Sequence, residues 1–168
     1  MLATNQKTIN KPIKLNGVGL HNGVNAELII KPAPENFGIK FCRVDIDKND
    51  LIPANFNNVI EPILCTKIAN TNGISVSTVE HLMAAFFGEG IDNAIVEVNA
   101  SEIPILDGSA SDFVEAIRSA GIIEQKAQRQ FLKVEKKVEI KDGEKHISIE
   151  PADNDLIIDF EIVYKNPL

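Results

Sequence analysis

The sequence predicts an α+β fold in which a sheet and two helices form two layers. Three patterns support it: segments in which apolar and polar residues alternate, two stretches with helical periodicity, and an internal repeat. The repeat makes this layer the first copy of a duplicated fold, followed by the opening strands of a second copy. We therefore expect a complete first domain over residues 1–126 and a truncated second domain over residues 127–168.

Strands are expected where apolar residues recur at every second position. Ala26, Leu28 and Ile30 lie on one face of such a segment, with Glu27 and Lys31 on the other. A proline-rich turn over residues 32–36 leads to a strand over residues 38–44, and a further strand covers residues 93–99.

Two helices are expected, each with a glycine as its C-terminal signal. The first follows Ser77 and ends near Gly88 or Gly90, and the second starts at Ser109 and ends at Gly121. Each start matches a capping box, in which a serine is followed three residues later by an acidic residue. The second helix carries one apolar stripe, formed by Phe113, Val114, Ile117 and Ala120.

The internal repeat relates the beginning of the chain to its last forty residues. Residues 28–33 (Leu-Ile-Ile-Lys-Pro-Ala) resemble residues 147–152 (Ile-Ser-Ile-Glu-Pro-Ala), and the same offset matches Ile39 with Ile158 and Phe41 with Phe160. Upstream, residues 11–15 resemble residues 136–140, and residues 141–144 form a plausible hairpin turn. Unrelated β-hairpins also look alike, but matched apolar positions on both sides of a Pro-Ala turn favour duplication.

The most informative segment is Ser-Thr-Val-Glu-His at residues 77–81. It places Glu80 and His81 side by side on the first turn of a helix, where free N–H groups and the positive end of the helix dipole favour anions. A histidine there can hold a metal, and a neighbouring glutamate can take a proton from an activated water. A capping box between Ser77 and Glu80 would explain the same residues without chemistry. The zincin motif His-Glu-x-x-His is absent.

Composition excludes several classes of function. The net charge of −7 argues against nucleic acid as a partner, and the sequence has no apolar run of about 18 residues that could span a membrane. Because the first residues lack the apolar core of a signal peptide, we expect a cytoplasmic protein with Cys42 and Cys65 as free thiols. Its three histidines are His21, His81 and His146.

Four motifs occur in a fixed order: Gly-Val-Gly-Leu-His-Asn-Gly (17–23), Ser-Thr-Val-Glu-His-Leu (77–82), Gly-Ile-Asp-Asn (90–93) and Glu-Ile-Pro-Ile-Leu-Asp-Gly-Ser (102–109). Together they resemble the UDP-3-O-acyl-N-acetylglucosamine deacetylases, zinc hydrolases of lipid A synthesis in Gram-negative bacteria. The family fold is a duplicated α+β domain with two outer sheets and the helices packed between them.

The resemblance also implies a set of site residues. It makes His81 a zinc ligand and Glu80 the catalytic base. It places the remaining zinc ligands, a histidine and an aspartate, beyond residue 168. It puts His21 close to the cleft, and Ile63 and Cys65 near the acyl chain of the substrate.

The residues alone also allow purely structural interpretations of these positions. His21 can equally be a turn histidine in an exposed, glycine-flanked loop, and residues 63–66 can be a plain strand. Asp-Gly-Ser at residues 107–109 is expected to be structural, a turn followed by a helix cap. His146 is expected to face solvent from an alternating strand.

Two functions from different classes remain. The chain can be an incomplete part of the deacetylase, with an acylated UDP-sugar as substrate, a zinc ion and a missing second domain as partners. Alternatively, it can be a non-catalytic sugar-nucleotide-binding or protein-interaction module that keeps the fold. Strands after Phe131 that lack covering helices would leave apolar faces exposed, which favours a homo-oligomer.

Overall fold

The computed structural model describes residues 5–46, 50–153 and 156–163. The expectations for residues 1–4 and for the chain around Leu168 lie outside the described residues. The chain forms two compact units, residues 1–129 and residues 130–168. Each unit is described by itself below.

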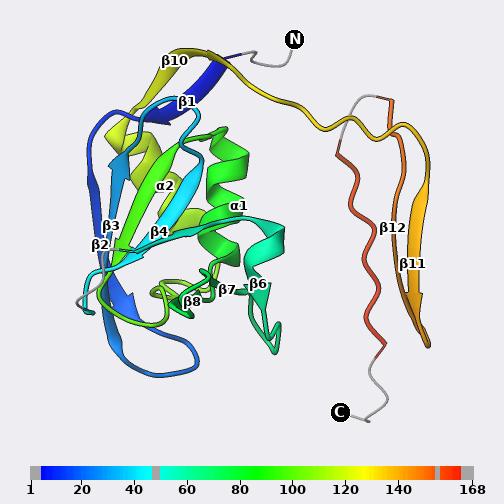
Figure 1. Cartoon of the computed structure of the whole chain (residues 1–168), viewed down its shortest axis with the longest axis horizontal. Helices are drawn as coiled ribbons and strands as arrows, with labels where there is room; N and C mark the ends of the chain where they lie inside the picture. Colours follow the sequence, from blue (N-terminus) through cyan, green and yellow to red (C-terminus); the bar gives the residue numbers. More distant parts are fainter. Residues whose placement is uncertain (1–4, 47–49, 154–155, 164–168) are drawn as a thin grey trace. The chain divides into compact units, whose positions relative to one another are not determined.

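The first unit is built on a five-stranded mixed sheet (Figure 1). In sheet order the strands are β2 (Ile13–Val18), β3 (Asn25–Pro32), β9 (Ala94–Val98), β4 (Ile39–Arg43) and β5 (Leu51–Pro53). Neighbouring strands run antiparallel except β9 and β4, which pair in parallel. Buried residues alternate along β3, as its sequence pattern predicts.

Two helices, α1 (Glu80–Glu89) and α2 (Ser111–Ala120), pack side by side and cover one face of this sheet (Figure 1). Their buried side chains join those of the strands in one hydrophobic core. This arrangement confirms the predicted α+β class. Within the described ranges, no helix is long and apolar enough to cross a membrane. The helix residues buried in the core are Leu82, Ala85 and Phe86 of α1 and Phe113 and Ile117 of α2.

Two smaller sheets complete the first unit. A three-stranded sheet contains β6 (Val59–Ile60), β7 (Lys67–Ala69) and β8 (Ser75–Ser77), and it follows the short 3-10 helix η1 (Phe56–Asn58). The other sheet pairs β1 (Asn5–Ile9) with β10 (Ile122–Gln128). The boundary expected after residue 126 thus falls inside β10, and the compact unit extends to Arg129, whose guanidinium binds Asp92 at 2.7 and 2.8 Å.

The second unit contains one hairpin, β11 (Val138–Asp142) and β12 (Lys145–Ile149), in its described part. Its cross-strand pairs Val138–Ile149 and Ile140–Ile147 occupy the positions that the repeat matches to Ile13–Ile30 and Leu15–Leu28 of β2 and β3. This correspondence supports the duplication, which stays a prediction. Residues 156–163, matched by the repeat to β4, form no strand, whereas β4 pairs with both β9 and β5.

Both glycine stops are confirmed, and both capping boxes are wrong. Gly90 (φ 70°) and Gly121 (φ 80°) end the helices.

The helix starts differ from the predicted capping boxes. The N-cap residues are Val79 and Ala110, and neither cap side chain bonds the helix. Ser77 instead ends β8 and donates its hydroxyl to the carbonyl of Ser101. The second start shifts to Ser111 because Ser109 forms a turn before it.

A buried amide network ties β1 and β10 to the main sheet, and Asn93 is its centre. The Asn93 side chain donates to Gln6 at 2.9 Å and to Gln125 at 2.7 Å, and it accepts the N–H of Gly38 at 2.8 Å.

We expect Asn93→Ala to lower the free energy of unfolding by about 2–4 kcal/mol, because buried partners lose their hydrogen bonds. Urea denaturation of the chain measures this loss, with the exposed Asn57→Ala as control. Equal stability of the two variants would contradict the expectation.

Candidate active site at the start of helix α1

The first turn of α1 carries the two residues singled out from the sequence. Glu80 and His81 are the first two residues of the helix, and both are half-buried. The residue before Val79, Thr78, is buried and has a φ of 61°. This left-handed conformation turns the chain sharply from β8 into α1, so that the helix begins at Glu80 itself.

Glu80 brings the segment that contains Ile63 and Cys65 to the helix start. Its Oε2 accepts the backbone N–H of Thr66 at 3.0 Å, and the N–H of Val79 donates to the carbonyl of Thr66 at 3.4 Å. Cys65 is therefore adjacent in sequence to a residue that binds the Glu80 carboxylate, and it is a half-buried free thiol. Ile63 is 74% exposed. The carboxylate is oriented by a backbone donor, an arrangement that suits a base.

The charge of His81 acts on the carboxylate of Asp107. The Asp107 carboxylate is exposed and accepts both the N–H of Ser109 at 2.8 Å and the Ser109 hydroxyl at 2.8 and 3.0 Å. These bonds, with a smaller contribution from the charge of His81, lower the pKa of Asp107. The expected turn at residues 107–109 is thus confirmed, and it lies close enough to His81 for the two side chains to interact electrostatically.

His21 is connected to the helix start through one buried carboxylate, Glu102. The His21 side chain is exposed, while its backbone N–H donates to both oxygens of Glu102 at 3.1 and 3.2 Å. Glu102 also accepts the N–H of Asn22 at 3.0 Å and the hydroxyl of Thr78 at 2.7 Å. Burial acts to raise the pKa of Glu102, but the bonds from Thr78, His21 and Asn22 and the charge of His21 outweigh it and lower the pKa.

No sequence pattern predicted a role for Glu102, although this residue opens the motif at residues 102–109. The available signal was a carboxylate followed directly by Ile-Pro-Ile, since a charge in an apolar segment needs partners when it is buried. Glu102 is 1% exposed, which is rare for a glutamate unless its charge is compensated.

Strained backbone gathers around the same segments. Among the described residues, four non-glycine residues with positive φ each lie within two positions of a residue discussed above: Glu61 (41°) before Ile63, Leu64 (58°) beside Cys65, Thr78 (61°) before Glu80, and Leu106 (54°) beside Asp107. Such conformations cost of order 1–3 kcal/mol each and cluster at functional sites. The loops around the helix start are therefore held in fixed, unfavourable geometries.

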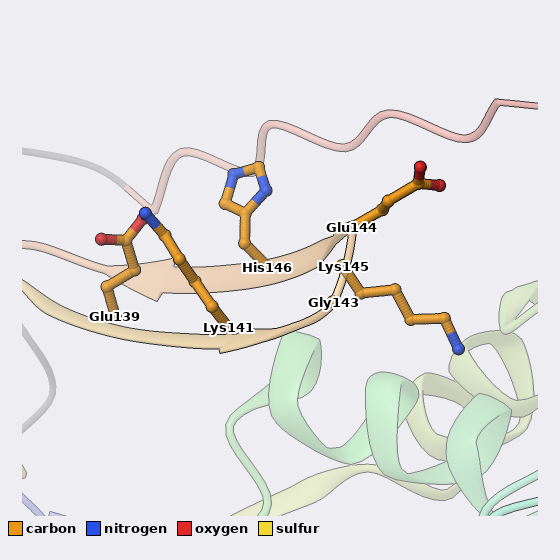
Figure 2. A pocket seen from close by; sticks show the side chains of 6 residues that line it. All are labelled: Glu139, Lys141, Gly143, Glu144, Lys145 and His146. Carbon is orange, nitrogen blue, oxygen red and sulfur yellow. The ribbon is translucent and has the colours of Figure 1, made fainter.

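A separate pocket lies on the β11–β12 hairpin and contains none of the predicted site residues (Figure 2). Its charged side chains, two acidic and two basic, project from an exposed hairpin. His146 is exposed, as its alternating strand predicts. The pocket is lined by Glu139, Lys141, Gly143, Glu144, Lys145 and His146.

The donor set at the helix start fits part of a zinc site. His81 offers one imidazole, a ligand found in both structural and catalytic zinc sites, and Glu80 offers a neighbouring carboxylate. In the portion of the chain that the structure describes, no group of three or more His, Cys, Asp or Glu residues could hold a metal. His81 therefore fits as one ligand among others that the described residues do not supply.

Comparison with known proteins gives one consistent result. The family model LpxC, described as UDP-3-O-acyl N-acetylglycosamine deacetylase, matches residues 6–168. Curated proteins named UDP-3-O-acyl-N-acetylglucosamine deacetylase are similar to almost the whole chain. That of Shewanella pealeana is 46% identical over 162 residues, which is 96% of this chain and 53% of the relative.

Two other relatives agree with this match. The protein of Pasteurella multocida is 45% identical over 162 residues, covering 96% of this chain and 53% of the relative. The protein of Histophilus somni is 46% identical over 159 residues, which cover 93% of this chain and 52% of the relative. The chain thus spans about half the length of the curated relatives it matches.

Proposed function

Because this chain belongs to the UDP-3-O-acyl-N-acetylglucosamine deacetylase family, we propose that it forms part of a zinc-dependent hydrolase of lipid A biosynthesis. The reaction is removal of the N-acetyl group from a UDP-3-O-acyl-N-acetylglucosamine in the cytoplasm. The observation that carries the proposal is the pairing of Glu80 and His81 on the first turn of α1, where the Glu80 carboxylate also binds the backbone next to Cys65.

The roles of the two central residues follow from their chemistry. His81 would hold the zinc ion, which when bound polarises an amide carbonyl and lowers the pKa of a water towards about 7. Glu80 would accept a proton from the attacking water and deliver it to the leaving amine. The hydrogen bond from the Thr66 N–H fixes the Glu80 carboxylate for this transfer.

The surrounding residues suit an acylated UDP-sugar. Ile63 and Leu64 are exposed apolar side chains next to Cys65, and contact with an acyl chain would cover them. His21 projects from a fixed turn and can donate to oxygens of the sugar nucleotide. A second domain would supply the other zinc ligands and the opposite wall of the cleft. The homo-oligomer expected from the sequence stays a prediction.

The test of this function is an acetate-release assay on a full-length form, in which this chain is joined to the remaining half of the Pasteurella multocida relative. We expect zinc-dependent release of acetate from the acylated UDP-sugar. His81→Ala should lower the zinc content, whereas His146→Ala, on the exposed hairpin, should not. Tight binding of the UDP-sugar without acetate release would instead favour a non-catalytic binding module.

The 168-residue chain by itself is expected to bind zinc weakly. One imidazole with one nearby carboxylate falls short of the three protein ligands that catalytic zinc sites use. Competition with a metal chelator measures the affinity. Nanomolar binding that survives His81→Ala would contradict both the expected weakness and the assignment of His81.

A further inference from the structure

Glu102 is the only fully buried acidic side chain among the described residues, and donors from two separate segments surround it. From one side it receives the N–H groups of His21 and Asn22. From the other side it receives the hydroxyl of Thr78. Removing a charge from water is costly unless hydrogen bonds replace the lost hydration, and here three donors do so. The geometry therefore favours an ionised carboxylate that joins two segments.

The first segment is a turn shaped to meet this carboxylate. The N–H of Gly19 donates to the carbonyl of Val24 at 3.0 Å, and the N–H of Gly23 donates to the carbonyl of Gly19 at 3.1 Å. A Cβ on Gly19 would lie 2.6 Å from Glu102 Oε2 and would also overlap the Asn22 side chain. Glycine is therefore required at position 19 for the turn to approach the carboxylate.

The second segment is the junction between β8 and α1. The N–H of Ser77 donates to the carbonyl of Ser101 at 3.0 Å, and the N–H of Ile103 donates to the carbonyl of Ser77 at 3.2 Å. These bonds place Glu102 directly beside Thr78, the residue with a φ of 61° that precedes the helix start. The 2.7 Å bond from the Thr78 hydroxyl offsets part of the cost of this strained conformation.

We propose that Glu102 is a positioning residue that holds the His21 turn and the Glu80–His81 helix start in one fixed relation. This inference rests on the proposed function and goes beyond it, because it assigns a role to a buried side chain that the proposed reaction does not use. A carboxylate is needed because all of its partners donate. An amide of the same shape would turn an N–H₂ group towards at least one of them.

The direct test is NMR spectroscopy of the 168-residue chain with Glu102→Gln. We expect the amide protons of His21 and Asn22 to move upfield as their charge-assisted bonds weaken. We also expect the amide signals of Glu80 and His81 to move, because Thr78 loses its acceptor. Glu97→Gln is the matched control: it removes a carboxylate that binds Lys31 on the main sheet at 2.6 Å, and it should leave all four signals in place. Movement of only one segment would overturn the coupling.

A second pair of variants keeps the test decisive if Glu102→Gln does not fold. Thr78→Val removes the hydroxyl without changing the side-chain shape, and Thr78→Ser keeps it. Thr78→Val should shift the amide signals of His21 and Asn22, whose N–H groups bond Glu102 and not Thr78. Thr78→Ser should restore the wild-type positions. Equal spectra of the two variants at these amides would refute the proposal.

Kinetics of the full-length form separate positioning from mere stability. We expect Glu102→Gln to lower kcat by about 10–100-fold, since small misplacements of reacting groups carry costs of this size. KM should rise as well, because the His21 turn moves. A variant that is only less folded would lose kcat in proportion to its active fraction and keep its KM. If the unmodified full-length form shows no deacetylation, the proposed function fails while the spectra of the chain still decide the role of Glu102.

Discussion

Glu80→Gln in the full-length form should lower kcat by about 10²–10⁴-fold while the protein keeps its zinc. Glutamine preserves the shape of the side chain and can still accept the N–H of Thr66 through its carbonyl oxygen. It cannot accept a proton from water at neutral pH, so the general base is lost. Acetate release gives kcat, and elemental analysis of the purified variant gives the zinc content.

Glu89→Gln is the matched control for this experiment. Glu89 lies at the other end of α1 and pairs with the exposed Arg118 at 2.8 Å, an ion pair that contributes little to stability. Its kcat should stay near that of the unmodified protein. Near-normal turnover of Glu80→Gln with zinc in place would show that another group acts as the base.

The largest expected change in stability follows from truncation of Phe113. Its side chain on α2 is 0% exposed and belongs to the same core as Leu82 and Phe86 of α1. Phe113→Ala should lower the free energy of unfolding by about 3–5 kcal/mol, because it removes buried apolar contacts and leaves a cavity. Urea denaturation of the chain measures the change.

Phe87 provides the comparison. It is 75% exposed on α1, so Phe87→Ala removes the same atoms from a side chain that contributes little to the core of this unit. Its free energy of unfolding should change by about 0.5 kcal/mol or less, as for surface substitutions in general. Equal losses for Phe87→Ala and Phe113→Ala would contradict the placement of α2 over the sheet.

The sequence predicted those parts of the fold that depend on local patterns. The apolar stripe of α2 and the alternation along β3 reflect which face is buried, and the two glycine stops reflect a backbone conformation that glycine adopts easily. The helix starts were not predicted correctly, because a capping box is also a local pattern and tertiary contacts replaced it. Glu80 binds the backbone of Thr66 instead of the helix start, and Ser77 belongs to β8.

In the candidate site, too, the sequence predicts the local arrangement but not the contacts between distant segments. The adjacency of Glu80 and His81 on a first turn could be predicted because it needs only the helix start and the sequence. The connection of His21 to Thr78 could not, since it runs through Glu102, which lies 81 residues after His21 and 24 after Thr78. No period or spacing in the chain indicates that these three segments meet. Their meeting depends on the bridge between Ser77 and Glu102, which forms only in the folded sheet.

The most direct measurement is anomalous diffraction at the zinc absorption edge from crystals of the full-length form. We expect a zinc peak about 2.0–2.1 Å from a ring nitrogen of His81, the usual length of a zinc–histidine bond. The Glu80 carboxylate should lie beside the metal within reach of a water on it. A fully bound zinc ion outside coordination distance of His81 would contradict the proposed site.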